Sequence, residues 1–332
     1  MTGENIRSAW KEMAIDRKFG QLHSPDEIFE FYPEILPDNR ARGFVNEGGH
    51  WLSNEEKGGK DLFGVEWVYV PSAGGSMEKP GVPCLLEDAN DWQQVIQWPD
   101  VDAWDWKGSG ERNKKILQSG KVNYIPLLNG FGFERLASFM GFENALVALI
   151  DDEQTDAVKA LLDRLADLAC RIIELCCTHF DIDGFLIHDD WGSQRDAFFS
   201  QQVGEELFVP AMQKITACIH AHGKVAELHS CGCLGRHIGN FVEGGWDIWH
   251  PMTNINDTMA LFKTYGDRIV LGVSPENEAG IPDTEESARA FAEDICADQR
   301  KVCVLSRYFV SRMSDTYKKA LNTAFGEICH NY

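Results

Sequence analysis

The sequence has no long apolar run and comparatively few basic residues. No stretch of about 18 consecutive apolar residues occurs, which is the length that a membrane-spanning helix requires. The first twenty residues are polar and charged throughout, unlike a secretory signal peptide. Lys and Arg number 31 against 52 Asp and Glu, which gives a formal net charge of −21. We therefore expect no membrane span, and neither nucleic acid nor an anionic membrane as a partner.

The chain also lacks the cysteine spacing of a disulfide-stapled protein. Many of its ten cysteines lie far from turns, and Cys176 and Cys177 fall inside a helical pattern. We therefore expect no disulfide framework and a cytoplasmic location. No internal repeat or low-complexity segment stands out. A length of 332 residues with 44% apolar content supports one large domain or two of ordinary size.

From residue 121 onward, short apolar strands alternate with helices. The predicted strands cover 121–130, 184–190, 224–229, 246–250, 267–276 and 301–309. The predicted helices cover 133–149 with a break at Gly141, 151–180, 204–220, 234–243, 256–265, 284–299 and 314–330. Apolar strands separated by helices indicate a parallel sheet with helices outside it.

The first third of the chain is irregular. Residues 1–40 carry helical signals, 41–110 are rich in Gly and Trp, and 61–70 alternate like a strand. One or two strands within 41–70 would bring the total to eight, and no Gly-x-Gly-x-x-Gly follows an early strand. We predict an α/β fold, a TIM-type (β/α)8 barrel forming a single domain over 1–332. Its N-terminal helices and loops cover 1–110, and the regular part covers 111–332.

The most informative pair is His229 and Cys231, which stand two apart at the end of a predicted strand. Residues two apart on a strand point the same way. Imidazole and thiolate are ligands that zinc prefers, although a buried histidine and a free cysteine with no metal are a valid alternative. The end of a strand in a parallel sheet is where such folds place their sites, which favours a metal site. Cys233 shares this side if the extended geometry continues past Gly232.

Most of the other predicted strands also end in polar or titratable residues. His188, Asp189 and Asp190 follow one another, so one aspartate is expected to face the cavity and the other to bind a neighbouring segment. Glu227 lies on the same face as His229, deeper in the fold. The candidate catalytic residues are Asp190, His188 and Asp189, and the candidate cofactor contacts are Asn129, Trp191 and His250.

Several stretches together resemble the uroporphyrinogen-decarboxylase-like superfamily, in its methyltransferase branch. They are DLFGVEW (61–67), GFERLASFMGFENAL (132–146), IHDDWGSQ (187–194), HGKVAELHSCG (222–232) and EGGWDIWHPM (243–252). They are spread over about two thirds of the chain, and the resemblance implies a TIM-type barrel. The arginine-rich motif of true uroporphyrinogen decarboxylases is missing from the early chain, which reads NRARGFVNEGGHW. Porphyrinogen decarboxylation is therefore disfavoured.

The methyltransferase branch implies a zinc ion held by a His-x-Cys pair and a distant cysteine. His229 and Cys231 fit the first two positions. The branch usually has its last cysteine after the final strand, and residues 307–312 contain none. Cys303, a few residues earlier, is the candidate third ligand, with Glu278 and Glu227 as oxygen alternatives.

The resemblance further implies methyl transfer between a small methylated substrate and a corrinoid (cobalamin) carried by a separate small corrinoid protein. The aromatic-rich first third suggests a methoxylated aromatic substrate and O-demethylation. Two alternatives remain open: a metal-free decarboxylase of the same superfamily, and a non-catalytic protein that binds a corrinoid or another small ligand. A homodimer is compatible with the acidic composition.

Overall fold

The computed structural model describes residues 3–17, 29–31, 45–46, 50–51, 58–72, 75–118, 120–127, 131–275, 280, 283–298, 300–306 and 313–328. Within these residues, seven strands form one sheet in which every pair of neighbours is parallel. In spatial order the strands are β1 (Phe29–Phe31), β7 (Val122–Leu127), β8 (Gly184–His188), β9 (Val225–Ser230), β10 (Ile248–Pro251), β11 (Val270–Val273) and β12 (Cys303–Leu305). The six strands predicted from residue 121 onward are thereby confirmed.

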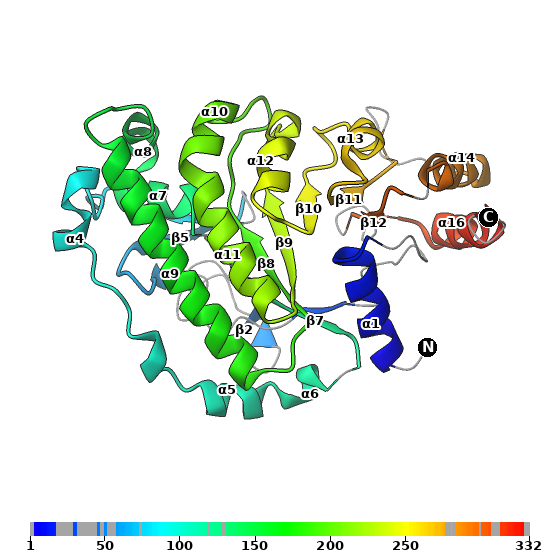
Figure 1. Ribbon diagram of the computed structural model, residues 1–332, viewed down its shortest axis with the longest axis horizontal. Coiled ribbons are helices and arrows are strands. Elements are labelled where there is room, and N and C mark those ends of the chain that lie inside the picture. The colour runs from blue at the N-terminus through cyan, green and yellow to red at the C-terminus, as the bar shows by residue number, and fades with distance from the viewer. Residues whose placement is uncertain are drawn as a thin grey trace.

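Helices connect successive strands and cover the sheet (Figure 1). In chain order they are α1 (Gly3–Ala14), α4 (Trp92–Val95), α5 (Trp106–Arg112), α6 (Lys114–Leu117), α7 (Phe133–Met140), α8 (Phe142–Ala148), α9 (Thr155–His179), α10 (Gln201–Val203), α11 (Val209–Ala221), α12 (Ile238–Glu243), α13 (Thr258–Tyr265), α14 (Glu285–Cys296) and α16 (Asp315–Ile328). Single turns lie at η2 (Ala89–Asp91), η3 (Val101–Ala103) and η5 (Gly235–His237), and η4 (Gly204–Phe208) is a π-helical turn ahead of α11.

The breaks between these helices follow from single residues. Gly141 has φ +78°, a left-handed conformation that side chains other than glycine rarely adopt, and it separates α7 from α8. Pro210 lies in the first turn of α11, directly after the π-helical turn η4. The break at Gly141 agrees with the sequence prediction.

The two faces of the sheet pack against different layers. One face is covered by α9, α11 and the other connecting helices, which enclose the main apolar core. The opposite face holds a smaller cluster in which Val122, Val225, Ile248 and Val270 meet Trp10 of α1. The Trp10 indole Nε1 donates a hydrogen bond of 2.8 Å to the Tyr124 hydroxyl. Helix α1 therefore covers part of this second face. The functional groups of the same face lie at the carboxyl ends of its strands.

The N-terminal third differs from the prediction. Strand β5 (Glu66–Val70) does not join the parallel sheet, because it pairs antiparallel with β4 (Gly59–Lys60) and β6 (Gly75–Glu78). A further antiparallel pair joins β2 (Val45–Asn46) to β3 (His50–Trp51). The seventh parallel strand is β1, inside a segment for which we predicted helix.

Closure into a barrel is not shown. Between the described parts of β12 and β1 no strand pairing joins the two edges of the sheet, so the architecture shown is a mixed α/β fold built on a parallel sheet. Across the described ranges, no helix is both long enough and apolar enough to pass through a membrane. Among the cysteines that the structure describes, eight are free and Cys296 is disulfide-bonded, a bond that the sequence did not lead us to expect.

Candidate metal centre

Three histidines lie in one row at the carboxyl ends of neighbouring strands. His188 of β8 is in register with His229 of β9, and His229 is in register with His250 of β10. Residues in register across a parallel sheet point to the same face. The rings of His188 and His229 are close, with centroids 4.9 Å apart. The sheet therefore places imidazoles from three strands at one edge.

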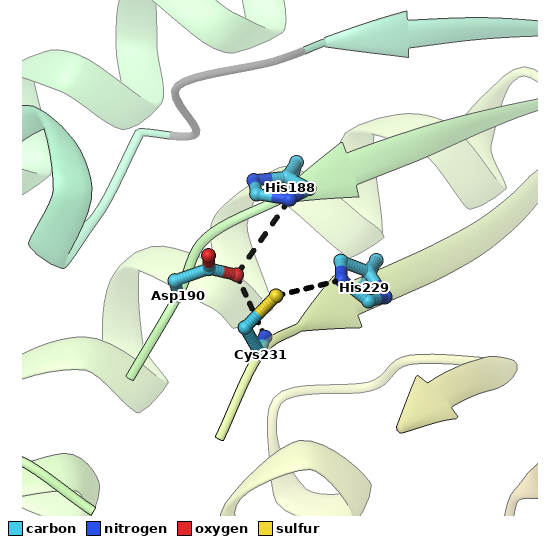
Figure 2. Close-up of side chains that lie close together, drawn as sticks. All are labelled: His188, Asp190, His229 and Cys231. Atoms are coloured by element: carbon cyan, nitrogen blue, oxygen red, sulfur yellow. Dashed lines mark hydrogen bonds and ion pairs between the residues drawn. The ribbon is translucent and has the colours of Figure 1, made fainter. Parts of the chain in front are cut away.

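Two of these histidines combine with residues from the next loops to form a group of four potential metal ligands. His188, Asp190, His229 and Cys231 each offer one ligand atom, and the four atoms all lie within 4.8 Å of one another. Figure 2 shows the four side chains pointing toward a common point. The Cys231 Sγ is 3.2 Å from the His229 Nε2, and the Asp190 Oδ1 is 3.6 Å from the His188 Nε2. We call these four residues the donor group.

Both imidazoles of the donor group are oriented by a hydrogen bond to the ring nitrogen that faces away from it. The His229 Nδ1–H donates to the backbone carbonyl of His250 at 2.9 Å. The His188 Nδ1 lies 2.9 Å from the Glu134 Oε2 in the first turn of α7. Metal-binding histidines are typically held in this way by a carbonyl or a carboxylate. Each ring is thereby left with Nε2 directed into the donor group.

A close contact between two glycines brings the loops after β8 and β9 together. Gly232 has φ +116°, and a Cβ built on it would lie 2.5 Å from the Gly192 Cα, so no larger side chain fits. The same approach allows the Cys231 backbone N–H to donate to the Asp190 Oδ1 at 2.7 Å. The Asn256 side chain fixes the loop further, because its amide donates to the Gly232 carbonyl at 2.9 Å.

Neighbouring charges shift the protonation of these groups in different directions. Burial lowers the pKa of His188, but the carboxylates of Asp190 and Glu134 raise it more, so that it lies well above its usual value. Burial, together with the charge on His188, lowers the pKa of His229 to about 4. Burial also raises the pKa of the Cys231 thiol. The donor group thus places an imidazole with a raised pKa beside one with a lowered pKa.

The two adjacent aspartates face opposite ways, as the strand pattern predicts. Asp190 points into the donor group, whereas Asp189 accepts hydrogen bonds from the backbone N–H groups of Phe133 and Glu134 at 3.0 and 2.9 Å. Burial raises the pKa of Asp189 to about 7 although these bonds act in the opposite direction. Asp189, a catalytic candidate from the sequence, therefore anchors the start of α7 and points away from the donor group.

Trp191, the candidate cofactor contact, lies away from the donor group. Its side chain is fully buried among Phe199, Phe208 and Phe241 on the helix-covered face, and its Nε1 donates to Asp189 at 2.7 Å. The alternation along the chain explains this, because Asp189 and Trp191 share one side and His188 and Asp190 share the other.

His250 and Glu227 form a buried pair beneath the donor group. The His250 Nε2 lies 3.2 Å from the Glu227 Oε1, and the Glu227 side chain is fully buried. Gly272 of the next strand makes room for the ring, since a Cβ there would lie 2.5 Å from the His250 Nδ1. His250 therefore contributes to the site through its carbonyl, which holds His229. Glu227 pairs with His250 and is not part of the donor group.

Cys303, the sequence candidate for the third ligand, lies on the other face of the sheet. It is buried in the apolar core beneath the helices, and its register partner is Leu271. This placement gives no support to a role as ligand for the same ion as His229. Asn129 and Glu278 lie outside the described residues.

Glu134 is the functional candidate that sequence reasoning missed. It stands at the start of the helix that follows the strand 122–127, one residue after Phe133. An acidic residue in the first turn of a helix is common, because it interacts favourably with the helix dipole. The useful signal was its place at the carboxyl edge of the sheet, beside the strand that carries His188.

The chemistry of the donor group fits a zinc ion. Two imidazole nitrogens, one sulfur and one carboxylate oxygen match the ligand types and the coordination number that zinc adopts in proteins. His188 and His229 are held with Nε2 inward, which is the orientation that coordination requires. The set differs from the predicted one, because His188 and Asp190 stand in place of a second sulfur.

No family model and no curated protein matches the sequence. Among solved structures, the chain is similar to a methyltransferase from Methanosarcina mazei, with 15% sequence identity and a TM-score of 0.55 over 80% of this chain and 76% of that one. The chain shares the fold of that methyltransferase. It is also similar to a 3-keto-D-glucoside 4-epimerase from E. coli, with 11% identity and a TM-score of 0.35 over 76% of this chain and 96% of that one, a likeness too low to carry an argument.

Proposed function

We propose that this protein is a zinc-dependent methyltransferase that moves a methyl group between a small methylated substrate and a corrinoid. The observation that carries the proposal is the donor group, which gathers four metal-binding side chains at the carboxyl edge of a parallel sheet. The shared fold with a methyltransferase and the family-like segments IHDDWGSQ and HGKVAELHSCG support the same assignment.

Some residues of the site would bind the metal ion, and others orient the two imidazoles. His188, Asp190, His229 and Cys231 would hold the zinc ion, while Glu134 and the His250 carbonyl fix the two imidazoles. When bound, zinc supplies Lewis acidity that weakens the bond between a methyl group and its heteroatom. If one of these four side chains leaves the ion when substrate binds, because catalytic zinc needs an open position, the Asp190 Oδ1 or the His188 Nε2 could then hold a proton there.

The proposed partner that gives or receives the methyl group is a corrinoid on a separate small protein. Such a corrinoid would supply a cobalt centre able to accept or donate the methyl group. This part of the proposal rests on the family resemblance of the sequence.

The methyl donor is proposed to be a small methylated compound. A methoxylated aromatic is one candidate, on the basis of the tryptophans in the first third of the chain. Trp67 and Trp106 are buried in the core, and Trp92, Trp98 and Trp104 pack against it. Because none of these side chains belongs to the donor group, methoxylated aromatics and methylamines both remain in the substrate screen.

The test is a methyl-transfer assay with zinc-loaded protein, free cob(I)alamin and a panel of methoxylated aromatics and methylamines. Formation of methylcobalamin with at least one donor, and its loss in Cys231→Ala, are expected. Release of carbon dioxide from an added carboxylic acid, continuing after zinc is chelated, would instead indicate the metal-free decarboxylase. Tight binding of cobalamin with no turnover by any donor would indicate a binding protein.

A further inference from the structure

A pair of cysteines lies across the interface between α9 and α11, which run side by side over the sheet (Figure 1). Cys170 belongs to α9 and Cys218 to α11, and both are partly exposed. The Cys218 thiol contacts the carbonyl oxygen of Cys170 at 3.7 Å, and the Cys170 thiol contacts that of Lys214, one turn before Cys218, at 3.6 Å. Each thiol also shifts the pKa of the other, which places the two sulfurs near one another across the interface. We call these two residues the thiol pair.

The surroundings of the thiol pair make its two sulfurs chemically different. The hydrogen bond from Cys170 and the charge of His222 lower the pKa of Cys218 to about 7, and the same hydrogen bond raises the pKa of Cys170. The His222 ring is held one turn beyond Cys218, because its Nδ1–H donates to the Cys218 carbonyl at 2.9 Å. A thiolate beside a thiol is the arrangement found in reactive cysteine pairs.

From this geometry we propose that the thiol pair is a modification site at which hydrogen peroxide forms a disulfide between Cys170 and Cys218, joining α9 to α11. The Cys218 thiolate attacks one peroxide oxygen, which breaks the O–O bond and, with one proton, gives a sulfenic acid and water. The Cys170 sulfur then displaces the hydroxyl of the sulfenic acid as a second water. Two thiols are oxidised by two electrons and one peroxide is reduced.

This site is separate from the donor group. Neither sulfur is among the four ligand atoms, and the two helices lie on the other face of the sheet from His229. The neighbouring thiols on α9 are less suited to the reaction. Cys176 is fully buried, and burial raises the pKa of Cys177 to about 11.

The sequence allows the disulfide to be identified directly. Trypsin releases Cys170 in the peptide 165–171 and Cys218 in the peptide 215–224, each with a single cysteine, whereas Cys176 and Cys177 fall together in 172–195. The full chain is reduced, treated with hydrogen peroxide at neutral pH, alkylated and digested without reductant. We expect a mass for 165–171 linked to 215–224. A link from 215–224 to 172–195, a Cys218 sulfinic acid with no link, or two unmodified thiols would overturn the proposal.

Three variants sharpen the test. Cys218→Ser should abolish the linked peptide, while the matched control Cys177→Ser should form it as the unaltered protein does. His222→Gln should still form the link but about threefold or more slowly, because less of Cys218 is then thiolate. Equal rates in His222→Gln and the unaltered chain would contradict the role given to His222. Should Cys218→Ser fail to fold, the peptide map of the unaltered chain decides alone.

Discussion

His188 and His229 stand side by side on neighbouring strands, and their surroundings pull their pKa values apart. Two carboxylates raise the pKa of His188, whereas burial and the charge on His188 lower that of His229 to about 4. A cation in the donor group would replace the proton of His188 and relieve this imbalance, since a metal ligand must be deprotonated. This relief of opposed pKa shifts would favour metal binding by the pair.

Removing the side chain of either His229 or Cys231 should remove the metal. His229→Ala and Cys231→Ala are each expected to purify with less than about a tenth of the zinc of the unaltered protein, because each deletes a ligand. Elemental analysis measures this. Cys233→Ser and Cys303→Ser are the matched controls and should keep their zinc, since neither sulfur is in the donor group. Full zinc content in Cys231→Ala, or its loss in Cys303→Ser, would contradict the ligand assignment.

Glu134 should matter to zinc affinity without binding the ion itself. Glu134→Gln removes the charge that orients and polarises His188, and loss of such a partner typically weakens metal binding by about 10- to 100-fold. Competition with a chromophoric chelator measures the affinity. Glu143→Gln changes an exposed carboxylate on the next helix and should have no effect. Equal affinities in the two variants would remove Glu134 from the site.

The glycine contact between the two loops should be needed for the geometry of the donor group. Gly232→Ala adds a Cβ that meets Gly192 and cannot easily adopt φ +116°, so we expect a loss of about 1–3 kcal/mol in unfolding free energy and weaker zinc binding. Gly223→Ala is the control, because Gly223 also has a positive φ but open space around it. Gly223→Ala should be less stable than the unaltered protein but bind zinc with the same affinity. Unchanged zinc affinity in Gly232→Ala would show that the contact does not position Asp190 and Cys231.

His220 should make stability depend on pH. Its hydrogen bond to Asp247, 2.9 Å long, raises its pKa above the unfolded value near 6.5. The stabilisation is therefore complete below about pH 6.5 and is lost as pH rises through the folded-state pKa. Urea unfolding should show His220→Gln less stable than the unaltered protein at pH 5.5, with a smaller difference at pH 9. When Asp247 is also changed to Asn, the effect of His220→Gln on stability should no longer depend on pH. A pH dependence that persists there would show that another group causes it.

The sequence predicted the regular part of the fold because its signals are local. Apolar runs bounded by turns mark β7 to β12, and the 3.6-residue period marks α9. β1 escaped detection because it has three residues, and β5 was placed in the wrong sheet because alternation does not reveal the pairing partner. Closure of the sheet depends on contacts between distant parts of the chain, which no local pattern encodes.

The site was predicted in part for the same reason. The strand ends identified His188 and Asp190 on one strand and the pair His229 and Cys231 on the next, but only the register of β8 and β9 shows that the four lie together. Cys303 was preferred because of its residue type. Its register with Leu271, which turns it toward the helices, cannot be read from the sequence.

The most direct test is X-ray absorption at the zinc edge of the zinc-loaded full chain. A donor group of His188, Asp190, His229 and Cys231 predicts a single sulfur at about 2.3 Å with nitrogen and oxygen neighbours at about 2.0–2.2 Å. Two sulfurs in the first coordination shell, or none, would contradict the account.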